Sequence, residues 1–189
     1  MAKGPNERAE DMASICMMEQ GDCLRDLGRL DEAAAAYEES IRRADQLGNT
    51  RQVAIGKSQL ATVFRLQRRY SEAVAAYAEA RRRFTALDEL DNVAVAWYLT
   101  GMVYQDLGHL EAAENAYSKS LAIEVPLGNV VGQASTLVQL GKLYHHTNRL
   151  DDAVAFYEQA AHKFVELHDL VNEGRARNNR ALVLRKLAA

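Results

Sequence analysis

The chain repeats itself every 40 residues, and this period constrains its fold more than any other feature of the sequence. Four similar segments begin at residues 28, 68, 108 and 148, and they read GRLDEAAAAYEESI, RRYSEAVAAYAEAR, GHLEAAENAYSKSL and NRLDDAVAFYEQAA. A fixed period of about 20–50 residues is typical of a solenoid, because one such unit cannot bury its apolar face alone. The sequence therefore predicts a stack of similar units with a continuous core.

Each unit contains two helical patterns, and each pattern pairs a small residue with a large one. Residues three or four apart share a helix face, so the pairs predict close contact between neighbouring helices. In the first pattern the pairs are Gly21 with Leu24, Ala61 with Phe64, Gly101 with Tyr104, Gly141 with Tyr144 and, once more, Ala181 with Leu184. In the second pattern they are Ala33 with Tyr37, Ala73 with Tyr77, Ala113 with Tyr117 and Ala153 with Tyr157.

From these patterns we expect nine helices. Their expected ranges are about 8–27, 31–46, 50–67, 71–86, 90–107, 110–125, 130–147, 151–166 and 170–187. Pro126 is expected to end or kink the helix before it, because proline has no N–H to donate.

The turns between the paired helices carry their own signals. A left-handed residue that ends a helix is supplied in three units, by Gly28, Gly108 and Asn148. Arg68 takes this position in the second unit, so we expect its turn to differ. N-cap oxygens for the following helices are expected from Asp31, Ser71 and Asp151.

The small–x–x–large pair followed by Ala–x–x–x–Tyr resembles the tetratricopeptide repeat, and the resemblance covers nearly the whole chain. The usual repeat has about 34 residues. The longer unit and its LGN linkers at 47–49 and 127–129 are similar to those of Pins-type adaptors, kinesin light chains and bacterial regulatory proteins. The resemblance implies an all-α, right-handed superhelical solenoid of four helix hairpins plus one extra C-terminal helix.

The resemblance implies that residues 1–189 form a single array of repeats. Its repeats would span about 8–48, 49–88, 89–128 and 129–168, followed by an unpaired helix at 169–187. Residues 186–189, KLAA, resemble the start of an expression-vector linker, so a vector-derived tail is one interpretation of them.

The resemblance also implies a concave groove that is lined by the first helices and holds a peptide or partner segment. The residues it assigns to this groove are Glu19, Asp22, Asp26, Gln59, Arg65, Tyr98, Leu99, Met102, Gln139, Lys142, His145, Arg175, Asn178, Asn179 and Arg185. Their side chains are acidic in the first repeat, apolar in the third and basic in the fourth and fifth. One hypothesis is a partner segment with an apolar centre, whose acidic part lies on the last two repeats. The alternative is that these are solvated charges and the partner binds elsewhere.

The expected function is a protein–protein interaction module, a scaffold or adaptor. The alternative is a peptide-sensing regulatory domain of a larger multidomain signalling protein. Nucleic acid is a poor default partner, because acidic and basic repeats alternate along the first three units and leave no sustained basic face. The sequence holds no phosphate-binding loop, zinc-protease motif or nucleophile elbow, so we expect neither an enzyme nor a cofactor.

A metal site is not expected either. His145 and His146 are adjacent, so their side chains point about 100° apart on a helix and cannot chelate one ion together. Arg81, Arg82 and Arg83 are interpreted as a solvated patch on a second helix, and Trp97 as a core residue.

A cytoplasmic location without membrane contact is expected. No apolar run reaches the roughly 18 residues that a membrane span needs, and Cys16 and Cys23 would lie about 10 Å apart on one helix, too far for a disulfide. The end helices carry apolar residues with no partner hairpin: Met12, Ile15 and Met17 at one end, and Ala181, Leu184 and Leu187 at the other. Either the parent protein continues, or the ends stack on another copy as a homo-oligomer.

Overall fold

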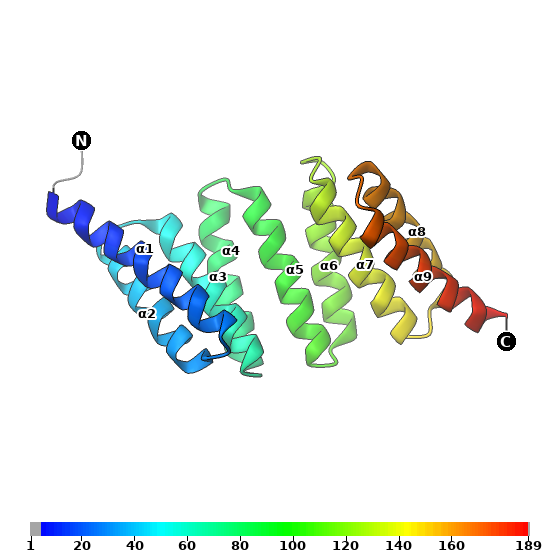
Figure 1. Cartoon of the computed structure of the whole chain (residues 1–189), viewed down its shortest axis with the longest axis horizontal. Coiled ribbons are helices and arrows are strands. Elements are labelled where there is room, and N and C mark those ends of the chain that lie inside the picture. Colours follow the sequence, from blue (N-terminus) through cyan, green and yellow to red (C-terminus); the bar gives the residue numbers. More distant parts are fainter. Residues whose placement is uncertain (1–4, 189) are drawn as a thin grey trace. The chain divides into compact units, whose positions relative to one another are not determined.

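A computed structural model describes residues 5–188 of the chain (Figure 1). Over these residues the chain is all-α. The helices are α1 (Pro5–Asp26), α2 (Leu30–Gln46), α3 (Thr50–Leu66), α4 (Tyr70–Ala86), α5 (Leu90–Asp106), α6 (Leu110–Glu124), α7 (Val130–His146), α8 (Leu150–Glu166) and α9 (Leu170–Leu187). Every expected helix is present, and α6 ends before Pro126 as predicted. The suggested vector-derived tail ends at residue 189, which lies outside the described residues.

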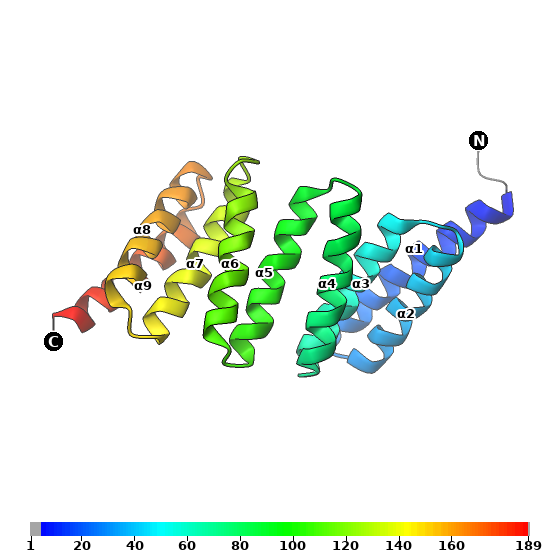
Figure 2. The same ribbon diagram turned by 180° about the vertical axis from the view of Figure 1, so that it is seen from behind.

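The chain divides into two compact units, one ending at Val103 and the other beginning at Tyr104. In unit 1, α1 packs on α2, α2 on α3, and α3 on α4. In unit 2, α6 packs on α7, α7 on α8, and α8 on α9. Figures 1 and 2 show that consecutive helices within each unit run antiparallel. The expected boundaries of the four repeats stay a prediction.

The repeated tyrosines form the centre of each hairpin. Tyr37, Tyr77 and Tyr117 have no exposed surface, and Tyr157 is 2% exposed. The glycines of the first helices leave room for these rings. A Cβ atom added to Gly21 would lie 2.6 Å from Tyr37 Cε1, and one added to Gly141 would lie 2.8 Å from Tyr157 Cδ1. The predicted small–large contact between paired helices is therefore confirmed.

The turn at Arg68 does not differ from the others, so that prediction was wrong. Arg68 has φ +61°, in the same left-handed region as Gly28 and Asn148. The backbone N–H of the next residue, Arg69, donates to the Phe64 carbonyl at 2.8 Å, as Arg29 donates to Leu24 at 2.9 Å in the first hairpin. These closing hydrogen bonds outweigh the roughly 1–2 kcal/mol that a left-handed conformation costs a residue with a Cβ.

The predicted N-caps were also wrong, because α2, α4 and α8 each begin one residue earlier than expected. Asp31, Ser71 and Asp151 lie inside the first turns of α2, α4 and α8. The residues that precede these helices are arginines whose side chains do not cap. They pair instead with a carboxylate three residues on: Arg29 with Glu32 at 2.6 Å, Arg69 with Glu72 at 2.5 Å, and Arg149 with Asp152 at 2.8 Å.

Side-chain N-caps occur at the first helix of a hairpin. Asn49 accepts from the Gln52 N–H at 3.1 Å and Asn129 from the Gly132 N–H at 2.9 Å. Asp169 accepts from the Asn172 N–H at 3.0 Å at the start of α9. Asparagine and aspartate are favoured here because a short side-chain oxygen satisfies an N–H that the helix leaves unpaired.

Candidate partner-binding surface

The residues assigned to the groove fall into two sets, one in each unit. The unit 1 set comes from α1, α3 and α5 and contains Glu19, Asp22, Asp26, Gln59, Arg65, Tyr98, Leu99 and Met102. The unit 2 set comes from α7 and α9 and contains Gln139, Lys142, His145, Arg175, Asn178, Asn179 and Arg185.

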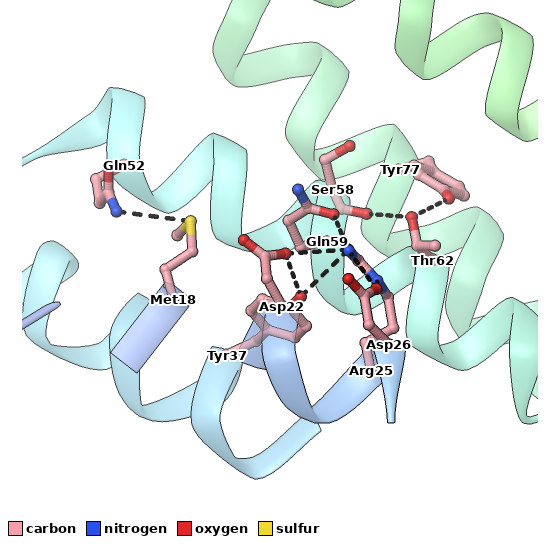
Figure 3. Close-up of polar contacts among 10 residues, drawn as sticks. All are labelled: Met18, Asp22, Arg25, Asp26, Tyr37, Gln52, Ser58, Gln59, Thr62 and Tyr77. Atoms are coloured by element: carbon pink, nitrogen blue, oxygen red, sulfur yellow. Dashed lines mark hydrogen bonds and ion pairs between the residues drawn. The ribbon is translucent and has the colours of Figure 1, made fainter. Parts of the chain in front are cut away.

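In unit 1 a hydrogen-bonded network joins α1, α2 and α3 around Asp22 (Figure 3). Tyr37 is buried in the hairpin, and its Oη donates to Asp22 Oδ1 at 2.7 Å. Burial, and then this hydrogen bond, raise the pKa of Tyr37 well above its usual value, so the hydroxyl stays a neutral donor. Arg25 Nη1 donates to the same Asp22 oxygen at 3.0 Å and to Gln59 Oε1 at 3.1 Å.

Arg25 also neutralises the neighbouring acid. Its Nε and Nη2 atoms donate to Asp26 Oδ1 at 3.1 and 3.0 Å. The guanidinium therefore lies between two of the three carboxylates that were expected to make this end of the groove acidic, and only Glu19 stands exposed on α1 without such a partner. The sequence did not reveal this role of Arg25, because its partners Tyr37 and Gln59 lie 12 and 34 residues away along the chain.

The rest of the unit 1 set is less exposed. Gln59, Arg65, Tyr98, Leu99 and Met102 are all partly buried. Leu99 packs against the unit 1 core. Thr62, next along the face of α3, lies 2.8 Å from the hydroxyl of Tyr77, so a second repeated tyrosine also reaches a first helix.

In unit 2 a cleft of about 590 Å³ opens between the α5–α6 turn and the end of α7. Gln105, Asp106, Lys142 and His146 provide its polar lining. The buried Tyr117 donates to Gln105 Oε1 at 2.8 Å, which fixes this amide on the wall of the cleft. Lys142 is exposed and forms no ion pair with the described residues.

The α9 residues of the unit 2 set are mostly exposed. Arg175 donates to Asn172 at 3.3 Å, a contact to a neutral amide. Arg185 is exposed and, like Lys142, has no carboxylate partner among the residues described. Asn178 is exposed and Asn179 is partly buried, whereas His145 and Gln139 on α7 are partly buried.

A second group of contacts in unit 2 was not foreseen. Tyr144 donates to Glu114 Oε1 at 2.7 Å, while Arg149 lies 3.1 Å from Glu114 and 4.2 Å above the Tyr144 ring. Burial, and then the bond to Glu114, raise the pKa of Tyr144 to about 12. The sequence signal was an arginine with an acid three residues later, at 29, 69 and 149. The contacts to Glu114 join α6 to α7 and to the turn that follows α7, and they are not part of the candidate surface.

The three consecutive arginines of α4 are not a simple solvated patch. Arg81 stacks on the ring of Trp97 at 3.6 Å. Arg82 and Arg83 both bind Glu79, at 2.9 and 2.7 Å. Two of the three charges are thus compensated within the helix, and the third is stacked on an aromatic ring.

Over residues 5–188, no group of three or more histidine, cysteine, aspartate or glutamate side chains is arranged to hold a metal ion. None of the described helices combines the length and apolar character that crossing a bilayer requires. Cys16 and Cys23 are both free and exposed.

Comparisons with known proteins agree with this architecture. No curated protein matches the sequence. Aspartyl phosphate phosphatase F from Bacillus subtilis has a similar structure, with a TM-score of 0.88 at 10% identity over 93% of this chain and 46% of that one. The apo form of RapI has a TM-score of 0.81 at 15% sequence identity, and the match covers 91% of this chain and 48% of RapI. BtubC from P. vanneervenii has a TM-score of 0.68 at 18% sequence identity, and the match covers 89% of this chain and 78% of BtubC.

The chain thus spans about half the length of the first two proteins, and at these identities the likeness concerns the fold. A family model described as tetratricopeptide repeat matches residues 13–86, 52–124 and 92–164 in three overlapping registers. With paired helices, buried tyrosines and a 40-residue period in place, this chain belongs to the tetratricopeptide repeat family.

Proposed function

We propose that this chain is a protein–protein interaction module, and that its unit 2 surface binds an acidic segment of a partner protein. Membership of the tetratricopeptide repeat family supports the general role of an interaction scaffold. The acidic partner is supported by one observation. The cations Lys142 and Arg185 have no carboxylate partner among the described residues, whereas Asp22 and Asp26 in unit 1 are already bound by Arg25.

The chemistry of the unit 2 set suits an extended acidic peptide. Lysine and arginine form charge-assisted hydrogen bonds with carboxylates, and asparagine amides can bind the peptide backbone in both directions. Lys142, Arg175 and Arg185 supply the first kind of group, and Asn178 and Asn179 the second. The cleft beside Lys142 offers a place for one side chain of the peptide.

The test is a double charge reversal, Lys142→Glu with Arg185→Glu, in the full chain. A matched control is Lys119→Glu with Arg177→Glu, which makes the same change of charge at exposed helix positions outside the set. Both variants and the parent would be immobilised and exposed to lysate of the source organism at low and high salt. We expect the reversal to lose a partner that the parent and the control both capture at low salt.

Binding that survives the reversal would contradict the proposal and place the contact elsewhere. A captured partner would then be mapped by its own truncations, and the proposal requires an acidic segment at the contact.

Regulation is the second candidate function, and it is favoured by the similarity to aspartyl phosphate phosphatase F. A peptide-sensing domain should change its dimensions when the peptide binds, whereas an adaptor should not. Small-angle scattering with and without the captured partner's acidic peptide separates the two. We do not extend the phosphatase activity in that protein's name to this chain, and a location in the cytoplasm stays a proposal.

Self-association also stays a proposal. Leu182, Leu184 and Leu187 on α9 are 46, 39 and 43% exposed, and Met12 on α1 is 61% exposed. Light scattering over a hundredfold range of concentration would detect stacking of these ends as a rise in mass. A constant monomer mass would contradict it.

A further inference from the structure

Unit 1 contains a cleft of about 430 Å³ that is separate from the candidate partner-binding surface. It lies over α3, between α2 and the end of α4. Its lining combines the apolar Ile41, Leu60 and Phe64 with charged residues, and Lys57 is one of these. A volume of this size is within the range of about 300–1,000 Å³ that is usual for ligand pockets.

This cleft uses a different face of α3 from the groove set. Lys57 precedes Gln59 by two residues, which is a turn of about 200° around a helix. A ligand in the cleft would therefore contact neither Gln59 nor the network around Arg25. The cleft also lies wholly within unit 1, apart from Lys142 and Arg185.

Lys57 breaks the pattern of the repeat. The residues 40 before, 40 after and 80 after it are Met17, Trp97 and Leu137. Leu137 is 3% exposed and lines an equivalent cleft of about 360 Å³ in unit 2. Lys57 therefore puts a charge where the other three hairpins have an apolar side chain, whereas the unpaired helix α9 has Arg177 at this position.

The charge of Lys57 is not directly paired within the described part of the chain. Lys57 is partly buried, yet it forms no hydrogen bond or ion pair with any described residue. Partial burial of an unpaired ammonium group reduces stability. A residue that breaks a local rule without internal compensation indicates a functional role.

The other two cations of the cleft, Arg42 and Arg83, are already paired. Arg42 binds Glu39 at 2.6 Å, and Arg83 binds Glu79 at 2.7 Å. Asp45 lies 4.0 Å from Arg83, and Glu38 adds a second, exposed carboxylate to the lining. Lys57 is therefore the cation that remains available to a ligand in this cleft.

We propose that the cleft binds a segment of a partner protein that carries a carboxylate beside a large apolar side chain. The carboxylate pairs with the Lys57 ammonium group, and the apolar side chain covers Ile41, Leu60 and Phe64. The charge selects an acid, and the apolar contact supplies most of the affinity.

The probe is an acetylated, amidated tetrapeptide of leucine, two glutamates and phenylalanine. Its control has both glutamates replaced by glutamine. Each would be titrated into the full-length chain and followed by amide chemical shifts in ¹H–¹⁵N NMR spectra. We expect shifts in α2, α3 and α4, and an affinity for the acidic peptide about fivefold higher than for the control, which corresponds to about 1 kcal/mol.

Three variants should change the affinity for the acidic peptide in a defined direction. Lys57→Met restores the residue type found at Met17 and should abolish the preference for the acidic peptide. Lys57→Arg should retain it. Glu38→Gln removes a carboxylate from the lining and should strengthen binding of the acidic peptide by about twofold.

Several results would overturn the proposal. Equal affinity for the two peptides, or unchanged binding by Lys57→Met, would remove the role of the ammonium group. Shifts confined to α7 and α9 would assign the peptide to the unit 2 surface instead. Binding of 4-phenylbutyrate without binding of the acidic peptide would make the cleft a site for small organic acids. Lys142→Glu with Arg185→Glu leaves this cleft intact, so failure here and failure of the proposed function are distinguishable.

Discussion

The junction between two successive hairpins is built differently in the two units. In unit 1, Ala44 of α2 is fully buried beside α3, where Gly56 lets the Ile41 side chain approach; a Cβ on Gly56 would lie 2.6 Å from Ile41 Cγ1. In unit 2, the residues 80 positions later are Glu124 on α6 and Thr136 on α7. The same backbone contact thus encloses an apolar side chain in one unit and a carboxyl group in the other.

The carboxyl group in unit 2 is only half satisfied. Glu124 is 2% exposed, and its Oε1 accepts hydrogen bonds from Ser120 at 3.0 Å and Thr136 at 3.2 Å. Its Oε2 is buried without a partner in the described structure. Gly132 makes room for it, because a Cβ there would lie 2.7 Å from Oε1. A repeat position therefore accepts a buried acid only when neighbouring residues change with it, as Gly132 and Thr136 do here in place of Gln52 and Gly56.

The largest expected effect comes from copying the acid alone into unit 1. Ala44→Glu would bury a carboxylate at a site that lacks a counterpart of Thr136, and would overpack the space that Ile41 fills. We expect a loss of about 3–5 kcal/mol in the free energy of unfolding at pH 7. Urea unfolding followed by circular dichroism measures it, with Gln46→Glu, an exposed position on the same helix, as the control. A loss below about 1 kcal/mol would show that the junction is less tightly specified than we argue.

The next effect tests the donor in unit 2. Thr136→Val keeps the shape of the side chain but removes the hydroxyl that donates to Glu124. Leaving a buried carboxyl with one donor fewer should cost about 1–3 kcal/mol. In a Glu124→Ala background the same change should cost much less, and a double-mutant cycle of unfolding free energies checks this coupling. Additive effects would mean that the hydroxyl does not serve the carboxyl.

Glu124 should also make stability depend on pH. Burial raises the pKa of its carboxyl group above the value in the unfolded chain, with the bonds from Ser120 and Thr136 acting in the other direction. The unfolded chain therefore releases this proton at a lower pH than the folded chain does, and the stability contributed by the neutral acid is lost as the pH rises through the folded pKa.

Glu124→Gln removes this dependence. The variant should be more stable than the parent at pH 8, by about 1 kcal/mol on the scale of one unsatisfied buried group, and similar to it at pH 4. Melting temperatures across this range provide the measurement. A parent that gains stability relative to the variant on going from pH 4 to pH 8 would reverse the sign and refute the argument.

The smallest expected effects on stability come from removing one charge from each candidate set. Arg25→Gln should lower stability by about 0.5–1 kcal/mol, because it removes the bonds that hold Asp22, Asp26 and Gln59 together. Lys142→Gln should change stability by less than about 0.5 kcal/mol, since no ion pair is lost. Equal effects in thermal unfolding would contradict the contrast on which the proposed function rests.

The fold was largely predictable from the sequence, because the period and the Ala–x–x–x–Tyr pairs are local signals repeated four times. Residue preferences for turn and N-cap positions predicted the turns less well. Arg68 adopts the left-handed conformation that glycine favours, since the closing hydrogen bonds around it are the same as in the other hairpins. The expected N-caps failed because an N-cap and a first-turn position differ by only one or two residues.

The candidate site was less predictable than the fold. The partner of Arg25 on α3 is Gln59, 34 residues away, so the neutralisation of Asp22 depends on how two helices are aligned. Glu124 reads in the sequence as an ordinary glutamate at the end of a helix. Only the positions of Ser120 and Thr136 reveal that it is buried and hydrogen-bonded.

The contact between glycine and tyrosine inside the hairpins has a consequence for how such a chain can change. Gly21 and Gly141 occupy places from which the rings of Tyr37 and Tyr157 exclude any side chain. In the second hairpin Ala61 occupies the equivalent place beside an intact, fully buried Tyr77, so a Cβ is accepted there only together with other changes in the packing of the hairpin. A residue larger than glycine at Gly21 or Gly141 therefore needs compensating changes elsewhere in its hairpin, and the single substitution is destabilising. Copying a whole hairpin avoids that barrier, so the structure favours growth by duplication over gradual change within a repeat.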